Sequence, residues 1–192
     1  MSKIKVFIFI ALGILLFSCN KKSKEETTVI SEESKEILQK YALETKGVLG
    51  KNLMNAINTQ GTEKAIEFCS TKAIVLTDSM SIAFNASIKR VSDKPRNPIN
   101  MANDNETAFI NELKQKISKG EKMTPKFTES DGKITGYFPI ETNAMCLQCH
   151  GSKDLDIKPN VLKKIAQLYP KDQATGYKEN QIRGIFVVTQ NK

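Results

Sequence analysis

Five consecutive residues in the last third of the chain have the types and spacing needed to hold a covalent cofactor. Cys146, Leu147, Gln148, Cys149 and His150 form a Cys-x-x-Cys-His motif, which is the attachment signature of c-type haem. In such a motif the two thiols form thioethers with the haem vinyl groups, and the adjacent imidazole binds the iron as proximal ligand. We therefore predict one covalently attached haem c.

The ligand on the other side of the iron cannot be a second histidine, because His150 is the only histidine in the chain. Cys69 is one sulfur candidate. It lies in a segment with helical apolar spacing, where Ala65, Cys69 and Ala73 fall on one stripe. Small residues above and below a thiol would let a helix lie close against a flat group. Composition alone favours the alternative that Cys69 is a small buried core residue.

Two further arrangements remain open from the residues alone. A thioether could replace the thiol, although methionines more often fill gaps in a core. A zinc site made of Cys69, Cys146, Cys149 and His150 is also formally possible. The candidate thioethers are Met80, Met101, Met123 and Met145, of which Met145 is the poorest because it adjoins the attachment motif.

The N-terminus has the pattern of an export signal. Lys3 and Lys5 precede an apolar run of twelve residues at positions 6–17, which suits a signal peptide and is too short to span a bilayer stably. The following Cys19 completes a sequence that resembles a lipobox. We predict a signal peptide at 1–18 and a lipid on Cys19 that anchors the protein to a membrane in the periplasm or at the cell surface. An uncleaved anchor or an ordinary signal peptide is the alternative.

The rest of the chain divides into a short linker and one domain. Residues 19–30 are polar and predict a flexible tether, and residues 31–192 predict the haem domain. The formal net charge is +8, and that basicity is spread along the chain. Predicted export and the lack of a recognised motif argue against nucleic-acid binding. Some positive charge could face the haem propionates or an acidic redox partner.

The apolar patterns predict the elements that must position these residues. One long helix or two stacked helices are expected at 31–59, and further helices at 62–77, 104–119 and 159–169. Strands are expected at 82–91, 126–128, 133–140 and 182–188, and those at 126–128 and 133–140 are expected to pair as a hairpin across residues 130–132. The last strand is apolar enough to be central in a sheet. This order predicts an α+β fold, an antiparallel sheet with helices on one side. Arg90 and Arg96 are candidate propionate contacts, and capping of loop carbonyls is an equal alternative.

Four segments in the expected order resemble one known family. They are the helical cysteine segment 65–69, the strand and Arg-Asn-Pro loop at 88–100, the haem motif at 146–150, and the segment 169–184. The family is the small bacterial c-type haem domain with a PAS-like sheet, catalogued as a domain of unknown function and also found as a sensory module. Residues 101–106 depart from the family pattern, which often continues with a proline and an acidic or aromatic stretch.

The resemblance implies a PAS-like sheet with long N-terminal helices packed on it, and His/Cys axial ligation with Cys69 at the matching position. A thiolate would favour ferric iron and lower the reduction potential relative to a His/Met site. We expect redox sensing or signalling through a partner protein, or electron transfer. Reduction, nitric oxide or carbon monoxide would displace Cys69 and move its helix. A peroxidase-like enzyme or a gas-binding sensor is the alternative, and the lack of a second histidine argues against an enzyme.

Overall fold

The computed structural model describes residues 29–192, so the predicted signal peptide, Cys19 and most of the predicted tether lie outside the described residues. The predicted α+β class is confirmed. The elements in chain order are α1 (Glu32–Phe84), β1 (Ser87–Val91), the 3-10 turn η1 (Pro98–Asn100), α2 (Asp104–Ser118), β2 (Lys126–Ser130), β3 (Lys133–Glu141), α3 (Ala144–His150), α4 (Pro159–Leu168) and β4 (Ile182–Asn191).

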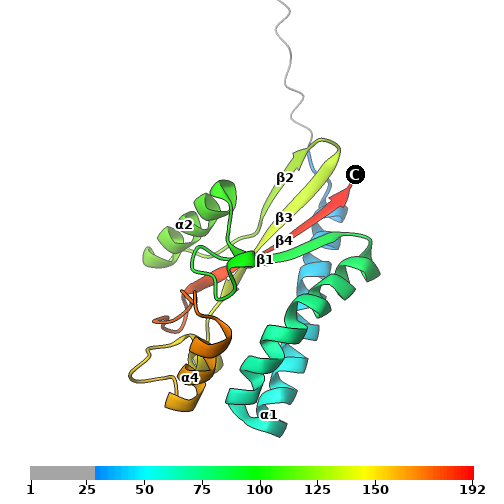
Figure 1. Ribbon diagram of the computed structural model, residues 1–192. Helices are drawn as coiled ribbons and strands as arrows, with labels where there is room; N and C mark the ends of the chain where they lie inside the picture. Colours follow the sequence, from blue (N-terminus) through cyan, green and yellow to red (C-terminus); the bar gives the residue numbers. More distant parts are fainter. Residues whose placement is uncertain (1–28) are drawn as a thin grey trace, which may run out of the picture.

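The element α1 is a helical hairpin rather than a single rod. Gly61 has φ 83° and ψ 165°, a conformation that is essentially restricted to glycine. It separates a first arm, residues 32–60, from a second arm, residues 62–84, and the two arms lie side by side (Figure 1). At the open end of the hairpin the rings of Tyr41 and Phe84 stack at 4.2 Å.

The second arm is longer than the sequence predicts. The strand predicted from residue 82 begins only at Ser87, because residues 82–84 complete the helix. Met80 and Phe84 lie one helical turn apart and both pack on the core, whereas Ile82 between them is 82% exposed. The short alternation at 82–84 fits a helix as well as a strand, and packing of the arm decides between them.

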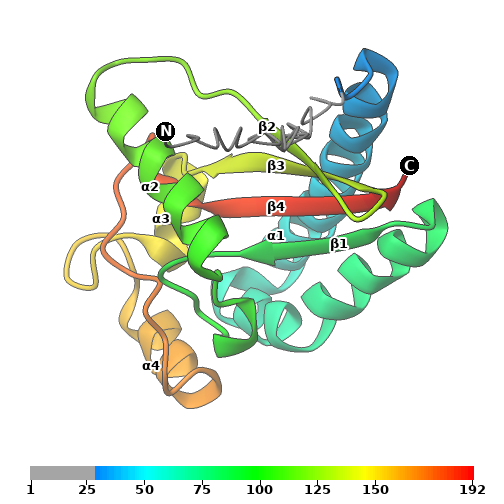
Figure 2. The same cartoon turned by 90° about the horizontal axis from the view of Figure 1, so that it is seen from above.

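The sheet has the order β1-β4-β3-β2 and is antiparallel throughout (Figure 2). The predicted hairpin is confirmed, with Asp131 and Gly132 both at positive φ in the turn, as tight hairpins require. The predicted central position of the last strand is also confirmed, because β4 pairs with β1 on one side and β3 on the other.

Helices cover both faces of this sheet, so the prediction of helices on one side is wrong (Figure 1). Along β4, Phe186 and Val188 join the core under α1, whereas Ile185 and Val187 join the core under α2. Successive strand residues point to opposite faces. The uninterrupted apolar run of β4 is the sign of a strand buried on both faces.

The helix α4 lies at one end of the molecule, and the start of α1 and the C-terminus lie at the other (Figure 1). Val161 and Ile165 of α4 pack on Ile66 of the second arm, and Lys164 pairs with Glu67 at 2.7 Å. This contact closes one side of the space between α1 and the sheet. Within residues 29–192, every helix falls short of the combined length and apolarity that a membrane span requires.

Candidate cofactor-binding site

The Cys-x-x-Cys-His motif forms the short helix α3 rather than a loop. The side-chain oxygen of Asn143 caps it by accepting the backbone N–H of Cys146 at 3.3 Å. Because the helix repeats every 3.6 residues, Cys146, Cys149 and His150 share one face. All three line a cavity of about 320 Å³, which is within the usual range for ligand and cofactor sites.

Both arms of α1 form a largely apolar wall of this cavity. Leu49, Leu53 and Ile57 come from the first arm, and Phe68 and Ile74 come from the second. The remaining walls are α3, the end of β3, the first half of β4, the strand β1 with the loop before η1, and Tyr169 beyond α4. A pocket with apolar walls and few polar groups suits a flat, mainly apolar ligand.

Cys69 lies on the second arm and lines the same cavity as the motif. Ala65 and Ala73 line it too, so the stripe predicted from the sequence faces the cavity. Burial raises the pKa of the Cys69 thiol, and the charges of Arg90 and Arg96 partly oppose that effect. Burial also raises the pKa of Cys149, to about 11. Without a cofactor, both thiols are therefore neutral near pH 7.

Three of the four candidate methionines lie elsewhere. Met80 packs on the core under α1 and Met123 on the core under α2. Met101 follows η1 and is 49% exposed. Met145 alone of the four lines the cavity, and it is the one that adjoins the attachment motif.

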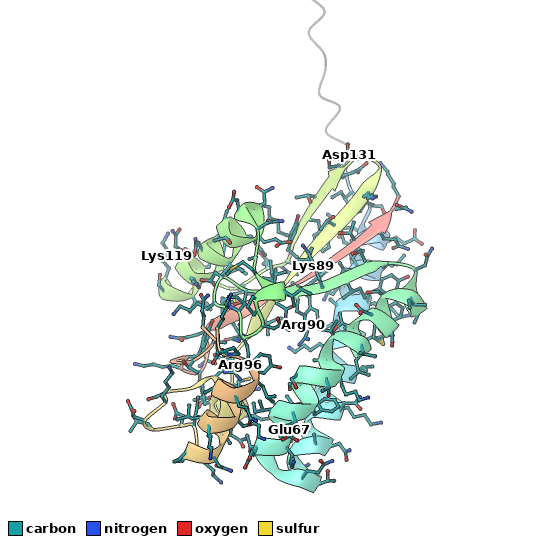
Figure 3. All side chains as sticks on the ribbon, viewed as in Figure 1. Glu67, Lys89, Arg90, Arg96, Lys119 and Asp131 are labelled. Carbon is teal, nitrogen blue, oxygen red and sulfur yellow. The ribbon has the colours of Figure 1, made fainter. Side chains whose placement is uncertain are left out.

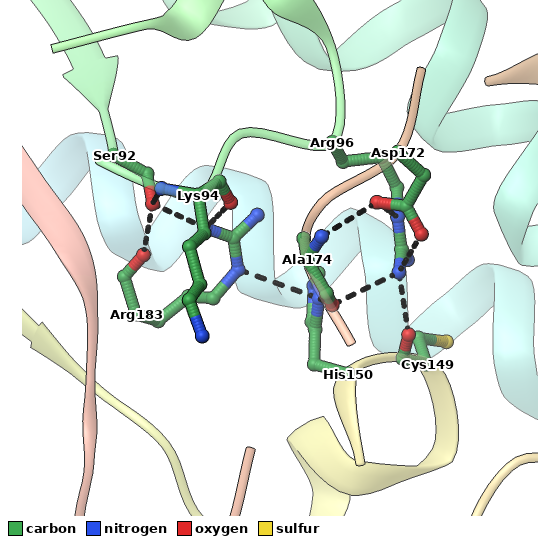
Figure 4. Close-up of polar contacts among 8 residues, drawn as sticks. All are labelled: Ser92, Lys94, Arg96, Cys149, His150, Asp172, Ala174 and Arg183. Atoms are coloured by element: carbon green, nitrogen blue, oxygen red, sulfur yellow. Dashed lines mark hydrogen bonds and ion pairs between the residues drawn. The ribbon is translucent and has the colours of Figure 1, made fainter. Parts of the chain in front are cut away.

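His150 is oriented by a carbonyl oxygen. Its Nδ1 lies 2.7 Å from the oxygen of Ala174 (Figure 4). A carbonyl can only accept, so Nδ1 carries the proton and Nε2 keeps the lone pair that a metal needs. Nε of Arg183 also lies 3.3 Å from Nδ1, but a protonated nitrogen cannot accept from it. The shorter contact, with the carbonyl of Ala174, decides the tautomer. Arg183 then acts on the imidazole through its positive charge and not through a hydrogen bond.

The imidazole is held in its neutral form. Burial lowers the pKa of His150 well below its usual range, and the positive charges of Arg96 and Arg183 lower it further. A neutral imidazole is the form that binds metals. The ring therefore has the tautomer and the charge expected of an axial ligand.

Arg96 ties the end of α3 to the segment that follows α4. Its Nη2 donates to the carbonyl of Cys149 at 2.6 Å and to that of Ala174 at 3.2 Å, and its Nε donates to Asp172 at 3.1 Å. Asp172 also accepts the backbone N–H of Ala174 at 2.9 Å. Arg96 therefore caps backbone carbonyls, which is the alternative to a propionate contact that the sequence left open. Arg96 also lines the cavity, so its propionate contact stays a prediction.

Arg90 has a different environment. It also lines the cavity, and both arginines lie between the sheet and the helices α1 and α4 (Figure 3). Within residues 29–192, no hydrogen bond or ion pair engages its guanidinium, and burial lowers its pKa. Arg90 is therefore the arginine whose side chain is available to an acidic group of a ligand.

Sequence reasoning missed several residues of the site, namely Tyr169, Asp172, Ala174, Arg183 and Gly184. Burial raises the pKa of Tyr169 to about 12. A Cβ on Gly184 would collide with the carbonyl oxygen of Val91, so only glycine lets β4 approach β1 here. All five lie in the segment 169–184 that carried part of the family resemblance. Asp172 and Ala174 lie in irregular backbone, which has no periodicity to show which side chains point inward, whereas Tyr169, Arg183 and Gly184 lie at the ends of regular elements.

The donor set fits haem better than zinc. Across residues 29–192, no group of three or more His, Cys, Asp or Glu side chains could hold a metal ion directly. The four predicted ligands therefore do not converge on one point, as tetrahedral zinc would require. Two thiols and an imidazole on one helical face, a further thiol on another wall and apolar surroundings fit a broad flat group.

The comparisons with known proteins give one family and one fold. The model of the family Tll0287-like (Tll0287) matches residues 20–191. Among solved structures, the chain is similar to one described as the cyanobacterial heme-protein Tll0287, with a TM-score of 0.60 and 19% identity, covering 85% of this chain and 98% of that one. At this identity the likeness establishes the fold. No curated protein matches the chain.

Proposed function

The chain belongs to the Tll0287-like family, and from this we propose that it is a c-type haem protein. Cys146 and Cys149 bind the haem covalently, and His150 binds its iron through Nε2. One structural observation supports these roles: the three side chains lie on the same face of α3 and line a mainly apolar cavity of about 320 Å³. A solved structure to which the chain is similar is also described as that of a heme-protein.

We further propose that Cys69 is the second axial ligand. Its thiol lines the same cavity from α1, with Ala65 and Ala73 on the same stripe. Ferric iron would favour the deprotonated thiol despite the burial that raises its pKa. The free guanidinium of Arg90 beside Cys69 suits a propionate, because its planar donors match a carboxylate.

The physiological role that we propose is one-electron redox chemistry outside the cytoplasm, as a sensor acting through a partner protein or as an electron carrier. Bound haem supplies the one-electron chemistry. The apolar arms of α1 exclude water from it, and Arg96 and Ala174 hold its proximal ligand. A lipid on Cys19 would tether the protein by the end of the molecule that lies away from α4 (Figure 1). An enzymatic role is disfavoured, because Cys69 would occupy the position that a peroxide needs.

The first test is covalent attachment. The full chain is expressed with a c-type haem maturation system, and denatured protein is examined for bound haem. We expect one covalent haem in the parent chain and in Cys69→Ser, and none in the double variant Cys146→Ala/Cys149→Ala. Haem that the denatured parent chain releases completely would contradict the proposal.

The second test concerns Cys69. Ferric Cys69→Ser should lose the low-spin thiolate-type spectrum of the parent protein. Met145→Leu is the matched control, because Met145 lines the same cavity, and it should leave that spectrum unchanged. Retention of the parent spectrum by Cys69→Ser would show that another group binds the iron.

The third test separates the two roles. Spectra recorded during potentiometric titration show whether the axial ligands change with oxidation state. Unchanged ligation with fast electron exchange supports an electron carrier. Loss of the Cys69 ligand on reduction supports a sensor, because the second arm of α1 would then be free to move.

A further inference from the structure

Arg183 is held in a fixed position beside His150. It is the second residue of β4, and its Nε lies 3.3 Å from Nδ1 of His150. Its Nη1 donates to the hydroxyl of Ser92 at 2.8 Å and to the carbonyl of Lys94 at 3.2 Å (Figure 4). The guanidinium also lies 5.5 Å from the centre of the Tyr177 ring. These contacts fix a positive charge against the imidazole.

No carboxylate is in direct contact with that charge. The direct contacts of the Arg183 guanidinium are all with neutral groups, and no acidic side chain within residues 29–192 forms an ion pair with it. Asp172, which pairs with Arg96, acts on Arg183 only from a longer distance. Arg96, the other arginine near His150, is different because Asp172 pairs with it at 3.1 Å. Arg96 and Arg183 both act on His150, but only the charge of Arg96 is balanced by an ion pair, so Arg183 supplies the positive charge at His150 that no ion pair balances. Its half-buried position leaves that charge poorly screened by solvent.

We propose that Arg183 is a positioning residue that acts through His150 to raise the reduction potential of the iron. The inference rests on the proposed function, since it needs iron bound to His150. Oxidised iron carries one more positive charge than reduced iron, and a fixed cation nearby disfavours the more positive state. Cys69 would act in the opposite direction, because a thiolate favours the oxidised state. The potential is set by these opposing effects.

A purely structural role predicts something else. Arg183 also joins β4 to residues 92–94, and a simple brace would affect the stability of the protein without affecting the potential of a correctly bound iron. The midpoint potential therefore distinguishes the two roles. It is measured by titration with a one-electron mediator and dithionite, in which the iron gains one electron and no covalent bond changes.

The experiment uses the full chain loaded with haem, with two neutral replacements, Arg183→Gln and Arg183→Met, and the charge-conserving Arg183→Lys. Lys94→Gln is the matched control. Lys94 carries a cation 5.9 Å from the same Tyr177 ring, but its side chain is exposed, and its backbone carbonyl stays available to Arg183. We expect both neutral variants to shift the midpoint potential downward with unchanged ferric spectra. Arg183→Lys should recover most of the shift, and Lys94→Gln should cause a much smaller one.

The outcomes separate the inference from the proposed function. A neutral variant with the parent spectrum and the parent potential would overturn the role of Arg183 and leave the haem proposal intact. Equal downward shifts in Arg183→Gln and Arg183→Lys would also overturn it, because the charge would then not be the cause. A parent chain without covalent haem would overturn the proposed function and the inference together.

Discussion

Three arginines surround the candidate site, and each has a different electrostatic environment. Arg96 is neutralised by Asp172, Arg183 contacts only neutral groups, and Arg90 has no partner within residues 29–192. An arginine is charged in all three cases, so the neighbours decide what the charge does. Arg96 holds the backbone carbonyls of Cys149 and Ala174 in place. Arg183 places a positive charge beside His150, and Arg90 is available to an acidic group of a ligand.

The pair of Arg96 and Asp172 should be important for stability. Their side chains are only 10% and 9% exposed, and Asp172→Asn would leave a buried guanidinium without its counter-charge. We expect a loss of about 3 kcal/mol in the free energy of unfolding. Urea denaturation measures it, with Asp154→Asn as control, because Asp154 is exposed and should change stability by less than about 0.5 kcal/mol. Similar losses of unfolding free energy in Asp172→Asn and Asp154→Asn would show that the pair of Arg96 and Asp172 does not stabilise the protein.

Arg90 should show effects of opposite sign in the empty and the loaded protein. A half-buried charge without a partner opposes folding, so Arg90→Met should stabilise the haem-free protein by about 1 kcal/mol. The haem-free form is obtained with Cys146→Ala/Cys149→Ala and compared by urea denaturation. In the chain that can attach haem, the same replacement should reduce haem incorporation, whereas Arg90→Lys should retain part of it. Unchanged incorporation in Arg90→Met would exclude a propionate contact.

At the scale of elements, the cavity depends on the hairpin of α1. The first arm supplies apolar wall residues and the second arm supplies Cys69, so the turn at Gly61 brings together residues that a continuous helix would separate. The contact of α4 with the second arm then fixes that arm against the end of the sheet.

Two glycine replacements in α1 should therefore change stability in opposite directions. Gly61→Ala puts a side chain where φ is +83° and should destabilise the protein by about 1–3 kcal/mol. Gly47→Ala lies within the first arm with no atom near the new Cβ, and it should stabilise by about 0.5–1 kcal/mol. Denaturant midpoints of the two variants provide the measurement. Stabilisation by Gly61→Ala would mean that the arms are not joined by this turn.

At the scale of the whole molecule, the described chain begins at the end opposite α4 (Figure 1). The proposed lipid on Cys19 would attach the protein at this end through the flexible tether predicted at 19–30, which would leave the α3 and α4 end accessible to the proposed partner.

The lipid anchor predicts a specific dependence on one cysteine. In a bacterial host the full chain should partition into the detergent phase of a detergent extract, and Cys19→Ser should move it to the aqueous phase. Cys69→Ser is the matched cysteine control and should remain in the detergent phase. Aqueous partitioning of the parent chain would contradict lipidation of Cys19, which lies outside the described residues.

The sequence by itself determined what depends on residue type and local spacing. The α+β class, the β2–β3 hairpin, the central last strand and the family were all predicted correctly, and the haem attachment that we propose for the motif 146–150 follows from adjacent residues alone. Local patterns carry this information because helix and strand periodicities and turn residues act over a few positions.

Only the tertiary structure decided what depends on distant contacts. It extended the second arm of α1 to Phe84, placed α2 on the face of the sheet opposite α1, and turned Cys69 toward the motif. It also distinguished Arg90, Arg96 and Arg183, and it chose the tautomer of His150 through the carbonyl of Ala174. Each result depends on partners brought together from elements far apart in the chain, and a charge or a lone pair acquires its role only from such neighbours.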